Sequence, residues 1–206
     1  MLHGLYAITD ARLTPEHLLI AKVSAALRGG ARVIQYRDKS SDNAAQLRQA
    51  RALVALCQRF ECPLIINDDP QLALASGAAG VHLGQGDSNL AHARALLGTD
   101  AIIGITCHDS LELALQAQQQ GADYVAFGAF FPSASKPGAK TAPLPLLHQA
   151  RQQLQIPIVA IGGISVDNAP QLITQGADMI AVIQDLFAAA DVKQHAQKLA
   201  ALFDVR

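Results

Sequence analysis

The chain has 206 residues, half of them apolar, and a formal net charge of −1. This length suits one large domain with a sizeable core, and the near-neutral charge excludes a broad basic surface for nucleic acid. There is no run of about 18 apolar residues and no signal-peptide pattern, so we expect a cytoplasmic protein that does not engage a membrane. The three cysteines are odd in number and lack metal-ligand spacing, which argues against disulfides and a zinc site.

Short apolar runs rich in β-branched residues predict eight strands along the chain. In order, these runs are LYAIT (5–9), RVIQY (32–36), PLIIN (63–67), GVHL (80–83), IIGIT (102–106), YVAFG (124–128), PIVAIG (157–162) and MIAVI (179–183). Segments between them are rich in Ala, Leu, Gln and Arg and have helical periodicity, as in residues 15–30, 42–60 and 110–121. Strand and helix therefore alternate, which is typical of a parallel sheet.

The joints between helices and strands support this interpretation. Glycine ends several helical segments just before a strand begins, as in GGARVIQ, GADYVAF and GADMIAV, and glycine there allows the left-handed turn that stops a helix. Eight strand–helix units favour a single-domain TIM (β/α)8 barrel over residues 1–206. The alternative, a doubly wound sheet, would need fewer strands and no closure.

Unusual polar residues follow these strands, at the barrel end where TIM-barrel enzymes carry their chemistry. Gln35, Arg37 and Lys39 stand at every second position, so a strand would present them on one face. Further along the chain come Asn67 and Asp68, then Asp87, Thr106 and His108, and finally Gly162, Gly163 and Gln184. A long loop over residues 127–143 precedes the last three, and its stretch SASKPGAK (133–140) is a candidate lid.

Each of these features also has a structural interpretation. Lone charges after strands are often solvated, an Asn-Asp pair is often a helix cap, His108 suits a surface position, and paired glycines can serve packing alone. Asp10 could cap the next segment or orient Lys39. Because all these residues follow strands, the barrel would bring them together on one rim, which favours a functional site over the separate structural interpretations.

Read as chemistry, the rim contains two anion sites and one cation site. Arg37, Lys39 and Lys136 would hold a polyanion, and the carboxylates Asp68 and Asp87 are suitable ligands for Mg²⁺ bridging phosphate oxygens. Backbone N–H groups near Gly163 and at the end of the last strand would hold a second phosphate. We therefore expect two phosphorylated substrates, one of them a diphosphate.

Seven strings in consistent order carry a family resemblance over essentially the whole chain: LYAITD, QYRDK, LIINDD, GVHLGQGD, ADYVAFGAFFPSASKPGA, PIVAIGGI and GADMIAVI. By these strings the chain resembles the thiamine-phosphate synthase family. The resemblance implies a TIM barrel that joins an aminopyrimidine diphosphate to a thiazole phosphate, giving thiamine phosphate and pyrophosphate. It also implies Mg²⁺ as cofactor and a dissociative mechanism.

The resemblance further implies the roles of individual residues. The pyrimidine diphosphate would be bound by Gln35, Arg37, Lys39 and Asn67, and Mg²⁺ by Asp68 and Asp87. The departing pyrophosphate would be contacted by Lys136, and the thiazole phosphate side by Ser133, Ser135, Gly163, Ile183 and Gln184. Thr106 stands where the family usually has Ser, and with Arg37, Lys39 and Lys136 it completes the expected catalytic set. Gln184 replaces a frequent Ser, which is tolerable if that position works through its backbone N–H.

Two other functions remain as alternatives. The sister family of thiazole tautomerases shares the barrel and a histidine at the position of His108, but a tautomerase needs neither a diphosphate nor Mg²⁺. A non-catalytic barrel that binds a phosphorylated ligand is the second alternative. The expected partners are two small phosphorylated substrates, without nucleic acid or membrane, and a homo-oligomer is possible.

Overall fold

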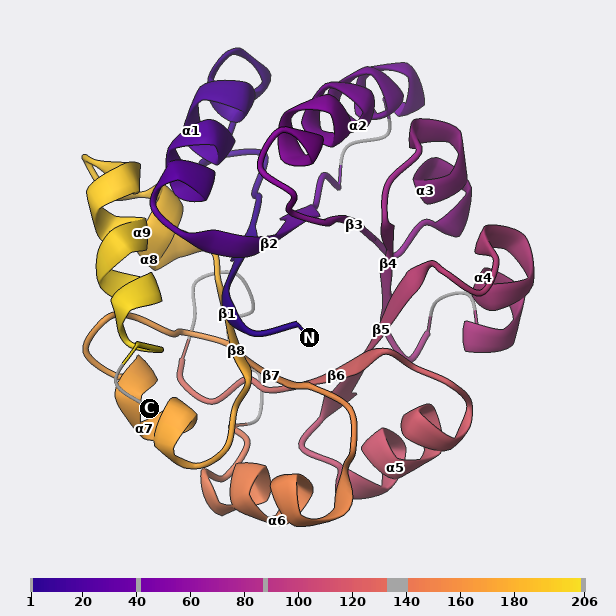
Figure 1. The fold of residues 1–206 in the computed structure, drawn as a ribbon, viewed down its shortest axis with the longest axis vertical. Helices are drawn as coiled ribbons and strands as arrows, with labels where there is room; N and C mark the ends of the chain where they lie inside the picture. The colour runs from indigo at the N-terminus through magenta and orange to yellow at the C-terminus, as the bar shows by residue number, and fades with distance from the viewer. Residues whose placement is uncertain (1, 40–41, 87–88, 133–140, 205–206) are drawn as a thin grey trace.

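A computed structural model describes residues 2–39, 42–86, 89–132 and 141–204. Eight parallel strands close into a barrel in the order of the sequence, and helices surround it (Figure 1). The strands are β1 (Gly4–Ile8), β2 (Ala31–Tyr36), β3 (Leu64–Asn67), β4 (Gly80–Leu83), β5 (Ile102–His108), β6 (Tyr124–Phe127), β7 (Ile158–Ile161) and β8 (Met179–Val182). The helices are α1 (Glu16–Arg28), α2 (Asn43–Gln58), α3 (Pro70–Ser76), α4 (Leu90–Leu97), α5 (Leu111–Gln119), α6 (Pro145–Gln153), α7 (Ala169–Thr174), α8 (Gln184–Phe187) and α9 (Val192–Ala201).

Each predicted strand overlaps an observed one, and the TIM-barrel prediction is confirmed. The doubly wound alternative is wrong, because β1 pairs with both β2 and β8 and leaves no open edge between the first and last strands. The predicted glycine turns also occur: Gly30 (φ 101°), Gly121 (φ 90°) and Gly176 (φ 112°) are all left-handed.

An aspartate after each of the last two glycines secures the start of a neighbouring strand. The Asp178 carboxylate accepts the Ile158 backbone N–H at 2.8 Å and the Arg151 guanidinium at 2.8 Å. Asp123 repeats the arrangement with the N–H of Ile103 in β5 and a guanidinium of α4, both at 2.7 Å. These contacts hold the amino-terminal ends of the strands, opposite the rim that carries the predicted site residues.

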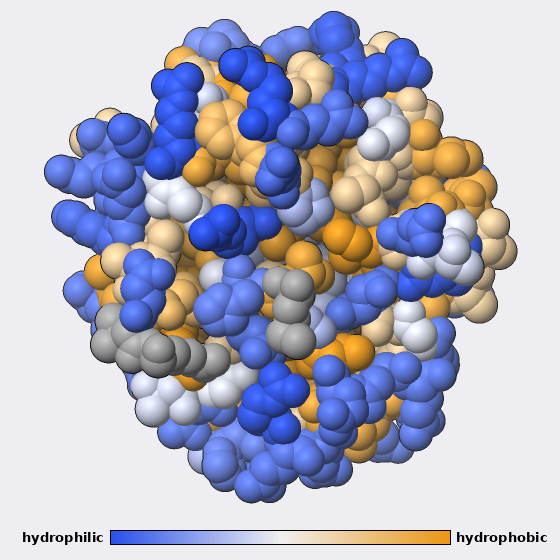
Figure 2. Space-filling view, viewed as in Figure 1, coloured by the Kyte–Doolittle hydropathy of each residue, from blue (hydrophilic) through white to orange (hydrophobic). Residues whose placement is uncertain are grey.

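Two apolar clusters make up the core. The larger lies between the strands and the surrounding helices, and the smaller fills the barrel interior with residues such as Val33, Ile65 and Met179. Leu2 packs against the interior cluster, so the chain begins across one opening of the barrel, near the centre of Figure 1. The same face in Figure 2 is a mixture of polar and apolar residues. None of the helices in the described part of the chain is long and apolar enough to cross a membrane.

Candidate active site

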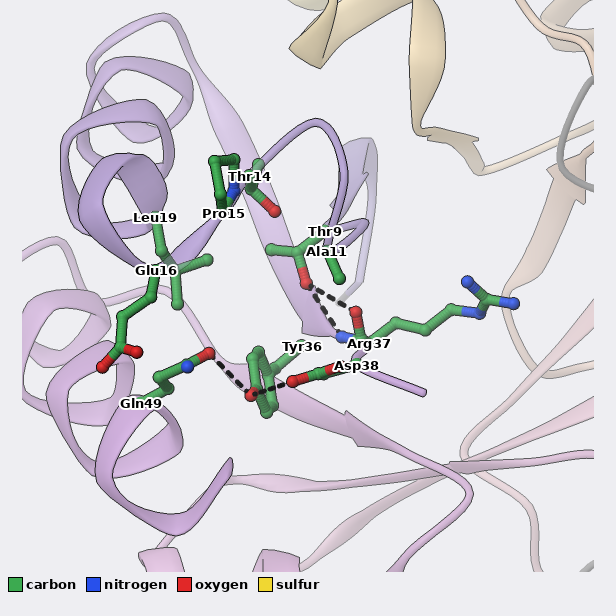
Figure 3. A pocket seen from close by; sticks show the side chains of 10 residues that line it. All are labelled: Thr9, Ala11, Thr14, Pro15, Glu16, Leu19, Tyr36, Arg37, Asp38 and Gln49. Carbon is green, nitrogen blue, oxygen red and sulfur yellow. Dashed lines mark hydrogen bonds between the residues drawn. The ribbon is translucent and has the colours of Figure 1, made fainter. Parts of the chain in front are cut away.

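The end of β2 alternates its side chains as the spacing predicts. Gln35 is 3% exposed and bonds within the barrel, whereas the Tyr36 hydroxyl bonds outside the barrel and donates to Gln49 Oε1 of α2 at 2.9 Å. In Figure 3 the side chain of Arg37 extends away from Tyr36 and Gln49. Gln35 and Arg37 therefore belong to the barrel side of the rim.

The adjacent end of β1 fixes the backbone that carries Arg37. Thr9 is buried, and its Oγ1 accepts the Arg37 backbone N–H at 2.9 Å and donates to the Arg37 carbonyl at 3.3 Å (Figure 3). The Asp10 carboxylate lies 3.9 Å from the Arg37 guanidinium and accepts the Arg12 backbone N–H at 3.0 Å. Asp10 thus caps the loop after β1 and faces Arg37 rather than orienting Lys39.

Lys39, Asn67 and Asp68 share a cavity of about 290 Å³ at the ends of β2 and β3. Asp68 has a left-handed backbone (φ 64°), which is costly for a residue other than glycine and is common at functional sites. The Asn67 side-chain amide donates to the Asp68 carboxylate at 2.6 Å. The structural alternative, a helix cap, applies instead to Asp69, whose carboxylate accepts the Leu72 N–H at the start of α3.

The donor chemistry at Asp68 fits Mg²⁺. No group of three or more His, Cys, Asp or Glu side chains that could hold a metal occurs in residues 2–39, 42–86, 89–132 and 141–204. Mg²⁺ is commonly bound by only one or two carboxylates, with waters and substrate phosphates completing its octahedron. Asp68 could supply one such carboxylate beside the cationic Lys39. The second predicted ligand, Asp87, lies outside the described residues.

A chain of hydrogen bonds crosses the barrel from β2 to β5. Gln35 Nε2 donates to the Tyr6 hydroxyl at 2.7 Å, and the Tyr6 and Tyr124 hydroxyls are 2.8 Å apart. The Tyr124 hydroxyl lies 3.0 Å from His82 Nδ1, and His82 Nε2 lies 2.9 Å from Thr106 Oγ1. These hydrogen bonds therefore join Gln35 and Thr106, two of the predicted substrate-binding residues, through three buried side chains.

The end of β5 departs from regular strand geometry at the predicted residues. The register with β6 shifts between Thr106 and His108, and His108 is exposed with a left-handed backbone (φ 51°). Such irregularities re-aim side chains at the rims of barrels. Cys107 between them points into the core, and burial raises the pKa of its thiol to about 12.

Sequence analysis missed Tyr6, His82 and Tyr124. All three stand in strings that were read as apolar strands, although a polar atom inside a strand that is buried on both faces needs a partner. Gly104 in β5 gives a second signal, because a Cβ built there would lie 2.0 Å from Tyr124 Cζ. A glycine in mid-strand often marks such a close approach.

Gly162 and Gly163 follow β7 with left-handed backbones. A Cβ on Gly163 would lie 2.3 Å from the carbonyl oxygen of Pro132, so the close approach observed here is to the loop after β6. Ile183 packs against the barrel interior, and Gln184 begins α8. The other end of α8 is held by the chain's first helix, since Lys22 Nζ in α1 donates to the carbonyls of Phe187 and Leu13, each at 2.8 Å.

Four predicted site residues cannot be placed. Asp87 lies outside the described residues, and so does the whole predicted lid, which contains Ser133, Ser135 and Lys136.

A family model described as thiamine monophosphate synthase matches residues 5–186. The chain belongs to this family. A thiamine-phosphate synthase of Thioalkalivibrio sulfidiphilus is 57% identical over 204 residues, which cover 99% of this chain and 97% of the relative. Another from Marinobacter nauticus is 60% identical over 184 residues, which cover 89% of this chain and 82% of the relative.

Among solved structures, a thiamine phosphate pyrophosphorylase from Pyrococcus furiosus has a TM-score of 0.89 and 36% identity, covering 98% of this chain and 95% of that one. The resemblance stated from the seven strings is therefore confirmed. The chain is an enzyme of the thiamine monophosphate synthase family, a transferase of thiamine biosynthesis.

Proposed function

We propose that this enzyme joins 4-amino-2-methyl-5-hydroxymethylpyrimidine diphosphate to 4-methyl-5-(2-hydroxyethyl)thiazole phosphate, releasing pyrophosphate and forming thiamine phosphate. The observation that carries the proposal is the convergence of Gln35, Arg37, Lys39, Asn67, Asp68 and Thr106 at the ends of β2, β3 and β5. These groups combine cations for a diphosphate, a carboxylate for a metal and neutral groups for a heterocycle. We propose that residues 1–206 act as one catalytic domain, and the cytoplasmic location and a homo-oligomer stay predictions.

The diphosphate is bound by Arg37 and Lys39. The forked guanidinium of Arg37 suits two phosphate oxygens, and its backbone is already fixed by Thr9. Both cations stabilise negative charge as it grows on the departing pyrophosphate, an electrostatic effect that is often the largest in catalysis. Lys136 is proposed to join them at the leaving group.

Asp68 and Asp87 are the proposed Mg²⁺ ligands. When bound, Mg²⁺ supplies positive charge to the phosphate oxygens of the leaving group. The Asn67 amide donates to Asp68 and so holds the carboxylate in place before a cation arrives.

The pyrimidine ring is proposed to lie between Gln35, Asn67 and Thr106. Departure of pyrophosphate leaves positive charge on a carbon beside this ring, and the aminopyrimidine can spread that charge. No strong acid or base is needed, so the chain's task is to orient the ring and exclude water. The thiazole nitrogen then attacks the cationic carbon, and holding both substrates together supplies much of the remaining rate.

The thiazole phosphate is proposed to bind at the ends of β7 and β8. Backbone N–H groups of Gly163, Ile183 and Gln184 would contact the phosphate, as often happens after these strands in TIM barrels. A backbone contact tolerates Gln184 in place of Ser. Ser133 and Ser135 would contact the same substrate from the loop after β6.

Pyrophosphate release tests this proposal. Purified protein is given both substrates, each substrate alone, and both substrates without Mg²⁺. We expect release only with both substrates and the metal, together with equal amounts of thiamine phosphate. Release of no pyrophosphate by folded protein would favour the tautomerase or the binding barrel. Interconversion of thiazole tautomers without a diphosphate then identifies the former.

A further inference from the structure

The hydrogen-bond chain across the barrel can be satisfied in two opposite polarities. A tyrosine hydroxyl has one proton to donate, and a neutral imidazole has one donor and one acceptor nitrogen. Burial raises the pKa of Tyr6 and of Tyr124 above the ordinary tyrosine value, so each hydroxyl keeps its proton. Once the direction of one bond is fixed, the direction of every other bond in the chain follows.

The orientation of the Gln35 amide selects one polarity. Its Nε2 faces the Tyr6 hydroxyl at 2.7 Å, and an amide nitrogen can only donate. Tyr6 then donates to Tyr124, and Tyr124 donates to His82 Nδ1. His82 must carry its proton on Nε2 and donate it to Thr106.

This polarity determines what each end of the chain offers to a ligand. Thr106 Oγ1 accepts from His82, so its own proton is available to a ligand acceptor. Gln35 Oε1 receives no hydrogen bond from the described residues, and no side-chain oxygen or nitrogen among them is both buried and unpaired. The Gln35 carbonyl oxygen is therefore the ligand-facing part of a side chain that is 3% exposed.

We propose that Tyr6 is a specificity-determining residue, because it holds Gln35 as a hydrogen-bond acceptor and sets Thr106 as a donor. Such a pair recognises a heterocycle with an exocyclic amino group and an unprotonated ring nitrogen. It rejects the analogue in which an oxo group and a ring N–H replace them. This inference rests on the proposed function for the identity of the heterocycle, but the polarity of the chain does not.

The tautomer of His82 tests the polarity without any substrate. Nitrogen-15 NMR of the imidazole in buffer of about pH 9, where an ordinary imidazole is neutral, distinguishes the two ring nitrogens. Comparison with the spectrum of His82→Gln assigns the signals. We expect the proton on Nε2, and a proton on Nδ1 would overturn the proposal.

Ligand discrimination tests the role of Tyr6. Calorimetry compares the binding of the 4-amino and 4-oxo pyrimidine diphosphates, which requires no turnover. In Tyr6→Phe the amide loses its acceptor and can rotate, so we expect the preference for the amino compound to fall roughly tenfold or more, the value of about one hydrogen bond.

Tyr124→Phe breaks the same chain of hydrogen bonds one step later and replaces Tyr6→Phe in the test if that variant does not fold. Its preference for the amino compound should also fall. Tyr36→Phe is the matched control, since its hydroxyl contacts Gln49 and Asp38 and takes no part in the hydrogen-bond chain across the barrel. Tyr36 lines the cavity proposed for the diphosphate, which both ligands carry, so its preference between them should equal that of the wild type. An unchanged preference in folded Tyr6→Phe or Tyr124→Phe refutes the role of the chain in specificity. Failure of the wild type to release pyrophosphate refutes the proposed function instead, and the NMR result stands apart from it.

Discussion

Thr9 has a buried hydroxyl that fixes the backbone of Arg37, a residue proposed to bind the diphosphate. Its Oγ1 both accepts from and donates to the backbone of Arg37, so the residue that follows β1 and the residue that follows β2 are held together. A long cation on a loosely held backbone would lose conformational freedom on binding a diphosphate. The two hydrogen bonds with Thr9 fix this backbone before the diphosphate binds, so less conformational entropy is lost on binding.

Thr9→Val should separate this role from simple packing. Valine keeps the shape but leaves the Arg37 N–H without its acceptor, which costs about 1–3 kcal/mol of unfolding free energy. We expect kcat/KM for the pyrimidine diphosphate to fall roughly tenfold, with less change for the thiazole phosphate. Urea unfolding and steady-state kinetics measure both effects. Thr9→Ser should restore both values, and a kinetic loss shared equally by the two substrates would count against the proposed role.

Asp68 and Asp69 form a matched pair of neighbouring carboxylates. Asp68→Asn should raise the Mg²⁺ concentration needed for half-maximal rate by on the order of 100-fold, since even groups behind a ligand change metal affinity by about 10–100-fold. Asp69→Asn retains a good helix N-cap and should leave the Mg²⁺ titration close to that of the wild type. Equal titrations of pyrophosphate release by the two variants would contradict Asp68 as a ligand.

At the scale of elements, the two G-A-D sequences show a device that strand prediction does not require. The glycine follows the helix, and the aspartate after it accepts a backbone N–H near the start of the neighbouring strand and a guanidinium from another helix, α4 for Asp123 and α6 for Asp178. This arrangement ties helix, turn and two strands together at one carboxylate. It lies away from the rim, so we expect it to stabilise the fold and not to take part in the reaction.

Asp178→Ala should therefore lower stability without altering the chemistry. Loss of the acceptor leaves the Ile158 N–H without its partner and takes the carboxylate away from the Arg151 guanidinium, which keeps the Leu154 carbonyl. The expected cost is about 2 kcal/mol. Thermal and urea unfolding should show this loss, while KM for both substrates stays at the wild-type value. Asp100→Ala is the control, because Asp100 is exposed and its carboxylate accepts a single long bond from the described residues, that of Thr99 at 3.4 Å. A changed KM in Asp178→Ala would connect the amino-terminal end to the active site and contradict this division.

The elements themselves could be predicted because their signals are local. Apolar runs and glycine stops lie within a few residues of one another, and the alternation of Gln35 and Arg37 with Tyr36 follows from strand geometry alone. The hydrogen bonds from Tyr6 to Tyr124 and from His82 to Thr106 could not be predicted from the sequence. The tilt and register of a closed barrel decide which inward side chains meet. Asp68 was predicted by its chemistry, but its left-handed backbone has no signal in the sequence.

At the scale of the whole molecule, the three cysteines report on global opening. Cys57, Cys62 and Cys107 are 1%, 8% and 0% exposed, and they lie in the shell between strands and helices. A hydrogen bond with Cys62, together with burial, raises the pKa of the Cys57 thiol, and burial raises that of Cys107 to about 12. At pH 8 these two thiols are protonated in the folded protein and unreactive.

Alkylation should therefore follow unfolding. At pH 8 we expect the rate of thiol modification to rise with urea in parallel with the unfolding curve measured by circular dichroism. Above about pH 8.5, unfolded thiols ionise before folded ones, so the free energy of unfolding should fall as pH rises. Rapid modification of all three thiols in native buffer would show that the barrel opens locally.

The pairing of Gly4 with Met179 has a consequence for synthesis of the chain. As the polypeptide leaves the ribosome, β1 has a neighbour on one side once β2 follows, but its other edge stays unpaired until the last strand emerges. An unpaired edge invites association with other chains. The tie from Lys22 to the carbonyl of Phe187 also forms only then. The residues proposed to bind the diphosphate, at the ends of β2 and β3, are thus made early, whereas the ends of β7 and β8 are made last. A chain released before β8 would expose the unpaired edge of β1 and lack the proposed site for the thiazole phosphate.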